Sequence, residues 1–232
     1  MAEIDTAMVL AAGLGTRIRA IAAGKPKPLV EVGGRALIDY ALDEVARGGA
    51  GRAVVNVHYE ADQIEAHLKD RAAPAITISD ERDARLETGG GLMRATPLLG
   101  EGPVFCTNTD AILEGGAARL AEGWRDAEMD ALLLLVPQER TSGYAGSGDF
   151  CLGADGRVSW NGESEKLVFT GLQVIHPRLW AGEEPRACST REFWDRAMRQ
   201  GRLFGLLHDG FWMHVGDPEG HAAAEARLGR GR

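Results

Sequence analysis

The sequence predicts a Rossmann-like α/β fold, in which helices flank a mixed, mostly parallel sheet. Apolar runs alternate with amphipathic segments through the first 136 residues, and strands that alternate with helices form parallel sheets covered on both faces. The first run, AMVLAA at residues 7–12, is apolar throughout and ends at Gly13, which is typical of a strand buried on both faces. We expect one domain over residues 1–232, with a core at 1–136 and a β-rich portion at 137–232.

The first portion contains four further predicted strands and three predicted helices. The strands are expected at residues 52–57, 75–79, 103–110 and 129–136, and the helices at 36–49, 60–70 and 90–99. In the first of these helices Leu37, Ile38, Ala41, Leu42 and Val45 share one face, and two glycines end it. Ligands of such sheets bind where the strands end, so the loop after Ala12 and the stretch TNTD at 107–110 are candidate binding segments.

The second portion predicts mainly short strands joined by turns. Residues 149–162 predict a hairpin that turns at Asp155-Gly156, and residues 167–177 predict a strand. Residues 189–201 predict a helix with a capping box formed by Ser189 and Glu192. Residues 202–218 predict two strands around Asp209-Gly210, and the closing helix at 217–229 is expected to be capped by Asp217.

Charge and composition exclude several classes of partner. The formal net charge is -8, which disfavours binding to nucleic acid or to an anionic membrane surface. The N-terminal stretch is acidic and its apolar run is too short for a signal peptide, so we expect a cytoplasmic protein. Cys106, Cys151 and Cys188 are widely spaced and odd in number, which favours buried thiols over a disulfide or zinc framework.

The opening loop has three features that are typical of phosphate binding. Gly13 and Gly15 allow backbone N–H groups to approach an anion, Arg17 adds a fork of donors, and Lys27 stands between two prolines that stiffen its backbone. A dinucleotide fingerprint is disfavoured because Ile18 occupies the place of its third glycine, and this disfavours an NAD-dependent oxidoreductase. The loop therefore predicts a triphosphate site; the alternative is a surface loop with solvated charges.

The stretch from Leu10 to Asp43 resembles the signature of the sugar-1-phosphate nucleotidyltransferases. Three further stretches, LETGGGLMRATPLLG at 86–100, TNTD and FTGLQVIHP at 169–177, make it most similar to their N-acetylmuramate α-1-phosphate uridylyltransferase branch. The resemblance implies the nucleotidyltransferase fold, with a sugar-binding lid in the β-rich portion. It implies that UTP and N-acetylmuramate 1-phosphate give UDP-N-acetylmuramate and pyrophosphate, in peptidoglycan recycling.

The resemblance also implies the site residues. Arg17, Lys27 and Asp110 would be catalytic. The nucleotide would contact Leu10, Ala11, Ala12, Gly13, Gly15, Thr16, Glu87, Thr88, Gly89 and Gly90, with the glycine run against the base, although a flexible helix start explains that run as well. The sugar would contact Asn108, Gly148, Asn161 and Gly171.

A divalent metal, Mg²⁺ by the resemblance, would be held by Asp110, whose carboxylate suits a hard cation. Relatives usually carry an aspartate where this chain has His214, and imidazole is a better ligand for Mn²⁺ or another softer ion than for Mg²⁺. Three interpretations stay open: His214 binds a softer metal, it lies nearby as a donor only, or the site is impaired. Asp110 could also be merely a cap for the next segment.

Two functional alternatives remain. One is a GTP-dependent mannose-1-phosphate or heptose-1-phosphate guanylyltransferase, and the other is a catalytically silent sensor of nucleotide sugars, which His214 suggests. The partners expected are UTP or another nucleoside triphosphate and a sugar 1-phosphate, with the chain a monomer or a small homo-oligomer.

Overall fold

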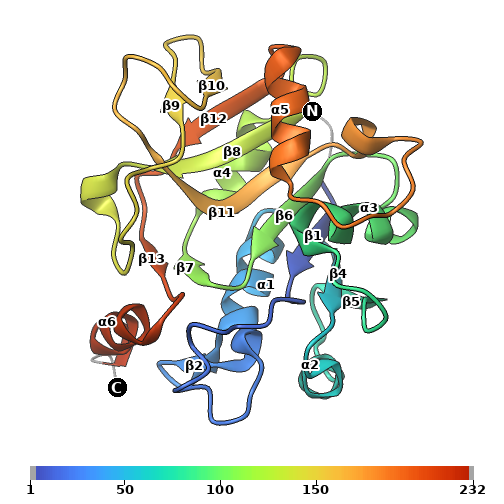
Figure 1. Cartoon of the computed structure of the whole chain (residues 1–232), viewed down its shortest axis with the longest axis vertical. Helices are drawn as coiled ribbons and strands as arrows, with labels where there is room; N and C mark the ends of the chain where they lie inside the picture. The colour runs from blue at the N-terminus through green and yellow to red at the C-terminus, as the bar shows by residue number, and fades with distance from the viewer. Residues whose placement is uncertain (1–3, 230–232) are drawn as a thin grey trace.

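The central feature of the chain is a seven-stranded sheet, seen in a computed structural model that describes residues 4–229 (Figure 1). The strand order is β12-β8-β11-β6-β1-β4-β5. In chain order the strands are β1 (Thr6–Leu10), β4 (Arg52–Val57), β5 (Ala75–Asp80), β6 (Val104–Asn108), β8 (Ala131–Val136), β11 (Val168–Ile175) and β12 (Leu203–Leu207). Only β11 runs antiparallel to its neighbours in this sheet, which confirms the mixed, mostly parallel sheet.

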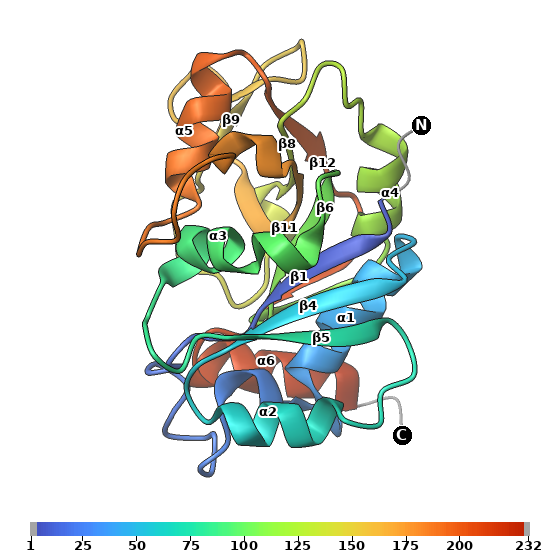
Figure 2. The same ribbon diagram turned by 90° about the vertical axis from the view of Figure 1, so that its right-hand side faces the viewer.

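Helices cover both faces of the sheet, so that the fold has three layers (Figure 2). The helices are α1 (Leu37–Arg47), α2 (Ala61–Leu68), α3 (Glu87–Leu99), α4 (Gly116–Gly123), α5 (Arg191–Arg199) and α6 (Pro218–Leu228). Helices α1, α2 and α4 contribute to the apolar cluster on one face, and α3 and α5 contribute to the cluster on the other face. The helices buried in this way confirm the layers that the alternating pattern predicts.

Short strands and turns lie between and beside the strands of the main sheet. Three two-stranded sheets pair β2 (Glu31–Val32) with β3 (Arg35–Ala36), β7 (Ala111–Leu113) with β13 (Trp212–His214), and β9 (Cys151–Leu152) with β10 (Val158–Ser159). Short 3-10 turns are η1 (Lys27–Leu29), η2 (Gln138–Arg140) and η3 (Pro177–Trp180). The β9–β10 pair is the predicted hairpin, and Gly156 in its turn has a φ of 81°.

The β-rich portion does more than form a lid, because two of its strands complete the central sheet. Strand β8 is buried at all six positions, so its backbone needs a partner on each edge. Strands β11 and β12 supply these partners. The predicted pair of strands around Asp209-Gly210 exists, but the two strands do not pair with each other: β12 joins β8, and β13 joins β7.

Two local expectations are wrong, and two elements were not predicted. Helix α3 begins at Glu87 and includes the glycine run that we expected before it. The capping box at Ser189 is absent, because Thr190 is the N-cap of α5 and the Glu192 carboxylate pairs with Arg186 instead. Helix α4 and strand β7 lie where no element was expected.

The N-terminus of α4 is capped from a distant helix. The buried Glu44 carboxylate, on α1, accepts hydrogen bonds from the N–H groups of Ala117 (2.8 Å) and Gly115 (3.2 Å). These groups would otherwise lack partners at the start of the helix. The contact joins positions 73 residues apart, so local sequence signals give no sign of it. The predicted cap of α6 is confirmed: the Gly220 N–H donates to Asp217 at 2.8 Å.

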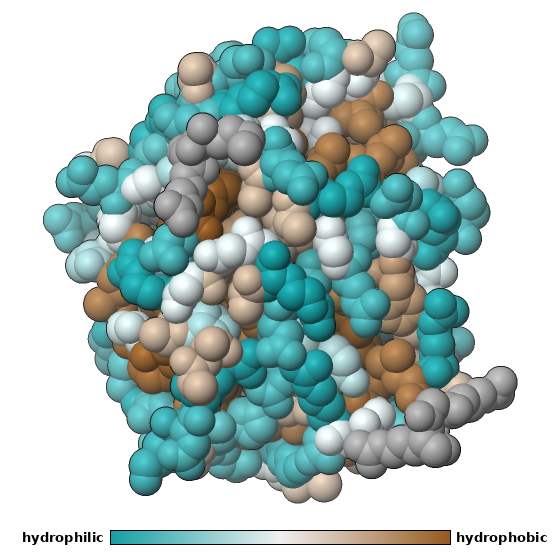
Figure 3. Space-filling model, turned by 180° about the vertical axis from the view of Figure 1, so that it is seen from behind, coloured by the Kyte–Doolittle hydropathy of each residue, from teal (hydrophilic) through white to brown (hydrophobic). Residues whose placement is uncertain are grey.

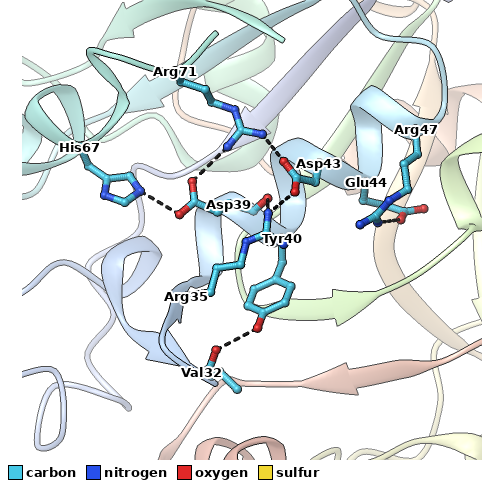
Figure 4. A network of polar contacts seen from close by, with 9 residues as sticks. All are labelled: Val32, Arg35, Asp39, Tyr40, Asp43, Glu44, Arg47, His67 and Arg71. Carbon is cyan, nitrogen blue, oxygen red and sulfur yellow. Dashed lines mark hydrogen bonds and ion pairs between the residues drawn. The ribbon is translucent and has the colours of Figure 1, made fainter. Parts of the chain in front are cut away.

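A charged network joins α1 to β3 and to the residues of and after α2 (Figure 4). Asp43 accepts from both Arg35, on β3, and Arg71, which follows α2. Asp39 accepts from Arg71 at 3.1 Å and lies 3.0 Å from the His67 ring. Because charge-assisted bonds to arginine are directional, the network sets how α1, α2 and β3 lie relative to one another.

The three thiols are buried and free, as expected. Burial raises the pKa of Cys106 to about 12, so this thiol stays protonated. Within residues 4–229 no helix is long and apolar enough to cross a membrane.

Apolar side chains on the surface are scattered. Figure 3 shows the face behind that of Figure 1, where brown patches are separated by teal, hydrophilic groups. The large apolar side chains exposed in the described chain are Ile21, Leu98 and Leu207, each less than half exposed. The main apolar residues are therefore used in the two cores beside the sheet.

Candidate active site

A pocket of about 460 Å³ opens where the strands of the sheet end. Strand β1 lies between β4 and β6 in the sheet. The chain runs from β1 to β4 on one side and later returns to β6 on the other side. This reversal of strand order is the place where open α/β sheets bind ligands. The walls are Leu10, Ala12, Gly13, Leu14, Gly15, Thr16, Arg17, Lys27, Pro28, Asn56, His58, Glu81, Arg85, Leu86, Glu87, Thr88, Asn108, Thr109, Asp110, Ser189 and Gly216.

The opening loop wraps one side of the pocket, and Gly15 is the residue that its path requires. Gly15 has a φ of 59°, and a Cβ built on it would lie 2.8 Å from the Cβ of Lys27. Both its conformation and the close approach of Lys27 favour glycine. Ile18 is fully buried in a third apolar cluster, which anchors the loop and explains why an apolar residue stands there.

Lys27 and Asp110 are in direct contact on the pocket wall. The Lys27 ammonium donates to the Asp110 carboxylate at 3.0 Å, and the lysine side chain is 12% exposed. Pro26 precedes the turn η1 with φ -66° and ψ 151°, and Pro28 is buried, so the segment that carries Lys27 is held stiffly. Residues 83 positions apart are thus brought together by the sheet and the opening loop.

Asp110 stays ionised in its surroundings. Burial by itself would raise the pKa of Asp110, but the Lys27 ammonium beside it helps to outweigh burial, and the pKa lies well below its usual range. Its carbonyl accepts from the Val215 N–H at 2.7 Å, which joins the end of β6 to the end of β13. The carboxylate therefore keeps its negative charge at neutral pH.

The start of α3 forms the opposite wall. Leu86, Glu87 and Thr88 line the pocket, but Gly89 and Gly90 do not. The N–H groups of both glycines donate to the Cys188 carbonyl, at 2.8 and 3.1 Å, and a Cβ on Gly90 would lie 2.2 Å from the Arg186 carbonyl oxygen. The structure thus places these two glycines against segment 186–189 rather than on the pocket wall.

A buried polar chain at the ends of β4 and β5 was missed by sequence reasoning. The Ala11 N–H donates to Asn56 at 2.8 Å, and Asn56 donates in turn to the Glu81 carboxylate at 3.0 Å. Burial raises the pKa of Glu81. His58 lies beside them, with its Nδ1 2.6 Å from the Glu81 carbonyl. The one available signal was polar residues at the ends of two apolar strands, as at 107–110. Ala11 itself is not on the pocket wall.

The residues expected at the sugar do not all lie together. Asn108 lines the pocket, and Gly171, with a φ of 90°, packs against it: a Cβ there would be 3.2 Å from the Asn108 side chain. Gly148 instead faces Lys166 and Gln138. Asn161 is exposed, and its carbonyl accepts from Ser159 at 2.8 Å. Only Asn108 of the four is a wall residue.

Two guanidinium groups on the pocket wall are available to an incoming ligand. Arg17 and Arg85 line it, are exposed, and make no ion pair with any residue in the range 4–229. An unpaired guanidinium is well suited to grip a phosphate in two-point contact. Within the same range no group of three or more His, Cys, Asp or Glu side chains could hold a metal ion. Asp110 and His214, whose Nε2 lies 3.8 Å from Asp110 Oδ2, can offer two ligands to an ion that also binds the substrate.

Comparison with known proteins points to one family. Residues 6–147 match the family model described as nucleotidyl transferase. The chain is 47% identical to the N-acetylmuramate alpha-1-phosphate uridylyltransferase of Caulobacter vibrioides, over 96% of both chains. It is 34% identical to the enzyme of the same name from Neisseria meningitidis serogroup B, over 90% of this chain and 92% of that one.

The fold is also that of solved structures. The inositol-1-phosphate CTP transferase from T. maritima superposes with a TM-score of 0.77, covering 99% of this chain and 98% of that one, at 16% identity. At this identity the similarity concerns the fold alone.

Proposed function

The chain belongs to the nucleotidyl transferase family, and we propose from this premise that it transfers UMP from UTP to N-acetylmuramate 1-phosphate. A phosphate oxygen of the sugar attacks the α-phosphorus of UTP, and the bond from that phosphorus to the β-phosphate oxygen breaks. The products are UDP-N-acetylmuramate and pyrophosphate. The choice of uracil and of the amino sugar is supported by the relatives at 47% and 34% identity, which carry that name.

The observation that carries the reaction type is the meeting of Lys27, Asp110 and Arg17 at one pocket. Lys27 is nearly buried and 3.0 Å from Asp110, while Arg17 has no partner among residues 4–229. Two polyanions must come together for this reaction, and charge grows on the leaving pyrophosphate. Groups that neutralise and position phosphates therefore supply most of the catalysis.

No general base is needed from the protein. The second pKa of a phosphate monoester is about 6, so the attacking oxygen is already ionised at neutral pH. In our proposal Lys27 bridges the α-phosphate and the sugar phosphate, and Arg17 with the N–H groups around Gly15 and Thr16 holds the β- and γ-phosphates. These donors lie on a loop held in place by Ile18 and by the stiff segment at Pro26, so they need little rearrangement.

A divalent ion completes the site in this proposal, and the residues present fit one. The ionised Asp110 would offer a hard oxygen ligand to such an ion, and His214 would offer a nitrogen ligand. When bound, the ion supplies further neutralisation of the phosphates. Asp110 itself holds the Lys27 ammonium at the pocket.

The base and the sugar are proposed to contact different residues of the pocket wall. We propose that Leu10, Ala12, Gly13, Glu87 and Thr88 contact the nucleoside, since all line the wall on the β1 and α3 side. Ala11, Gly89 and Gly90 support this wall from behind. Asn108 is proposed to contact the sugar directly, with Gly171 behind it. Gly148 and Asn161 would reach the sugar only if segments 141–149 and 160–167 close over it.

The setting proposed is peptidoglycan recycling in the cytoplasm, where UTP is made. The partners would be UTP and the sugar 1-phosphate, with the chain a monomer or a small homo-oligomer. Residues 1–232 are proposed to act as one domain, because the central sheet contains strands from both sides of residue 136.

The test is product identification by mass spectrometry with purified protein. UTP plus N-acetylmuramate 1-phosphate is compared with GTP plus mannose 1-phosphate and with GTP plus a heptose 1-phosphate, each in Mg²⁺ and in Mn²⁺. We expect UDP-N-acetylmuramate and pyrophosphate from the first mixture. Product from a GTP mixture alone would keep the reaction type and overturn the substrates. Binding of nucleotide sugar with no product in any mixture would support the sensor instead.

A further inference from the structure

The imidazole of His214 is oriented with one ring nitrogen toward a carboxylate and the other toward a carbonyl. Its Nδ1 lies 3.2 Å from the Gly143 carbonyl oxygen, and its Nε2 lies 3.8 Å from Asp110 Oδ2. A carbonyl oxygen can only accept, so the Nδ1 position carries the proton in this contact. In the neutral ring Nε2 then has a free lone pair, which faces Asp110.

This is the arrangement of a metal-binding histidine. Histidines that bind metals through one nitrogen usually donate the other N–H to a carbonyl or carboxylate. The distance of 3.8 Å is too long for a hydrogen bond to Asp110. It is shorter than twice a metal–ligand bond of about 2.1 Å, so one ion can contact both side chains.

We propose that His214 and Asp110 together form a two-ligand site that prefers Mn²⁺, Co²⁺ or Zn²⁺ over Mg²⁺. An oxygen-only site serves Mg²⁺ well, whereas a neutral imidazole favours the later divalent ions. The inference rests on the proposed function for the role of the ion, but binding of the ion can be measured without any substrate.

The position of His214 is fixed by its surroundings. A Cβ on Gly216 would lie 2.0 Å from the His214 ring, so a side chain there would displace the imidazole. Trp212 stacks beside the ring, with centroids 6.3 Å apart and planes at 15°. The backbone N–H of His214 also donates to the Ser142 carbonyl at 2.9 Å. The side chain is only 18% exposed, so little freedom remains to turn Nε2 away from Asp110.

The test measures metal binding to the full chain with the metal alone. Electron paramagnetic resonance of free Mn²⁺ gives its dissociation constant, and competition with Mg²⁺ gives the ratio of the two constants. His214→Asp and His214→Ala are compared with His58→Ala, which removes the imidazole that lines the pocket wall. Gly216→Ala serves as a second variant that moves the ring without removing it. The Co²⁺ absorption spectrum reports whether a nitrogen ligand is present.

We expect the preference of wild type for Mn²⁺ over Mg²⁺ to fall by about tenfold or more in His214→Asp, as for loss of a group that sets metal affinity. His214→Ala and Gly216→Ala should weaken Mn²⁺ binding, and His58→Ala should not. The Co²⁺ spectrum should change in His214→Ala. An unchanged metal preference in both His214 variants overturns the inference, as does loss of binding in His58→Ala alone or no Mn²⁺ binding to wild type at millimolar concentrations. None of these outcomes depends on turnover, so failure of this inference is distinct from failure of the proposed function.

Discussion

Arg17 is a cation without a carboxylate partner, placed on the wall of the pocket. The side chain is exposed, and no ion pair forms with it in the part of the chain that the structure describes. Its removal therefore breaks no ion pair in the described chain, and we expect the main effect to be on a bound ligand. This separates Arg17 from Lys27, whose ammonium also holds Asp110.

Arg17→Ala should lower kcat/KM about 100-fold or more, the cost of losing one donor to the charge of the transition state. The melting temperature should stay close to that of wild type. Pyrophosphate release and thermal unfolding are measured side by side. Arg19→Ala is the matched control, since Arg19 lies on the same loop over the Tyr59 ring and outside the pocket wall. Equal turnover in the two variants would remove Arg17 from the site.

Glu81 gives a pH-dependent prediction. Burial raises its pKa above 4.5, the ordinary value, so the folded chain holds the proton more tightly than the unfolded chain. This contribution is complete below the unfolded pKa and is lost as pH rises through the folded pKa. Glutamine does not titrate and can still accept from Asn56, so Glu81→Gln should gain stability relative to wild type as pH rises above 4.5.

The free energy of unfolding in urea is measured for both proteins between pH 4 and pH 8. Glu101→Gln, at an exposed position, is the control, and its difference from wild type should change less. If the free energy of unfolding of Glu81→Gln fell relative to that of wild type as pH rises, the raised pKa of Glu81 would be contradicted.

At the scale of elements, helix α3 shows what the sequence could and could not predict. The apolar face of its later turns was clear, but the glycine run was expected to lie against the base, with a flexible helix start as the alternative. In the structure the run is helical, and segment 186–189 packs against Gly89 and Gly90 too closely for a side chain. That partner is about a hundred residues away, so no local pattern predicts the contact.

Gly90→Ala should therefore destabilise the fold by about 1–3 kcal/mol through overpacking, because its Cβ would lie 2.2 Å from the Arg186 carbonyl oxygen. Gly102→Ala is the matched control: nothing lies within 4 Å of its Cβ, and we expect a change of less than about 1 kcal/mol. Urea unfolding measures both. Equal stability of the two variants would show that segment 186–189 does not press on α3.

The predictions that held at this scale rest on local chemistry. Asp217 before Pro218 gave the cap of α6, and Asp155-Gly156 gave the hairpin turn. Those that failed depend on distant partners. Glu44 caps α4 from α1, and Arg186 removes Glu192 from the expected capping box. The sequence placed Arg17, Lys27 and Asp110 at one site because they stand in the opening loop or at a strand end, and all three line the pocket, while their catalytic roles stay predictions. Asn56 and Glu81 were missed because their role depends on contacts between strands.

At the scale of the whole molecule, one sheet unites the two portions of the chain. Strand β11 lies between β6 and β8, so residues after 136 complete the layer that holds the pocket. Four of the five tryptophans lie after residue 136, at 160, 180, 194 and 212. Tryptophan fluorescence therefore reports mainly on the second portion, while circular dichroism reports on all of the helices and strands.

We expect a single unfolding transition in urea, with fluorescence and circular dichroism giving the same midpoint, as for one cooperative domain. Two separate midpoints would show that the core at 1–136 and the portion at 137–232 unfold independently.

The central claim is that the pocket at the ends of β1 and β6 transfers a nucleotide by neutralising phosphates. The most direct measurement is pyrophosphate release from UTP and N-acetylmuramate 1-phosphate by wild type, Lys27→Ala and Lys25→Ala. Lys25 lies two residues from Lys27, but it is exposed and pairs with Glu31 at 2.6 Å. We predict that kcat/KM falls about 100-fold or more in Lys27→Ala and stays near wild type in Lys25→Ala. Normal turnover in Lys27→Ala, in a folded protein, would contradict the claim.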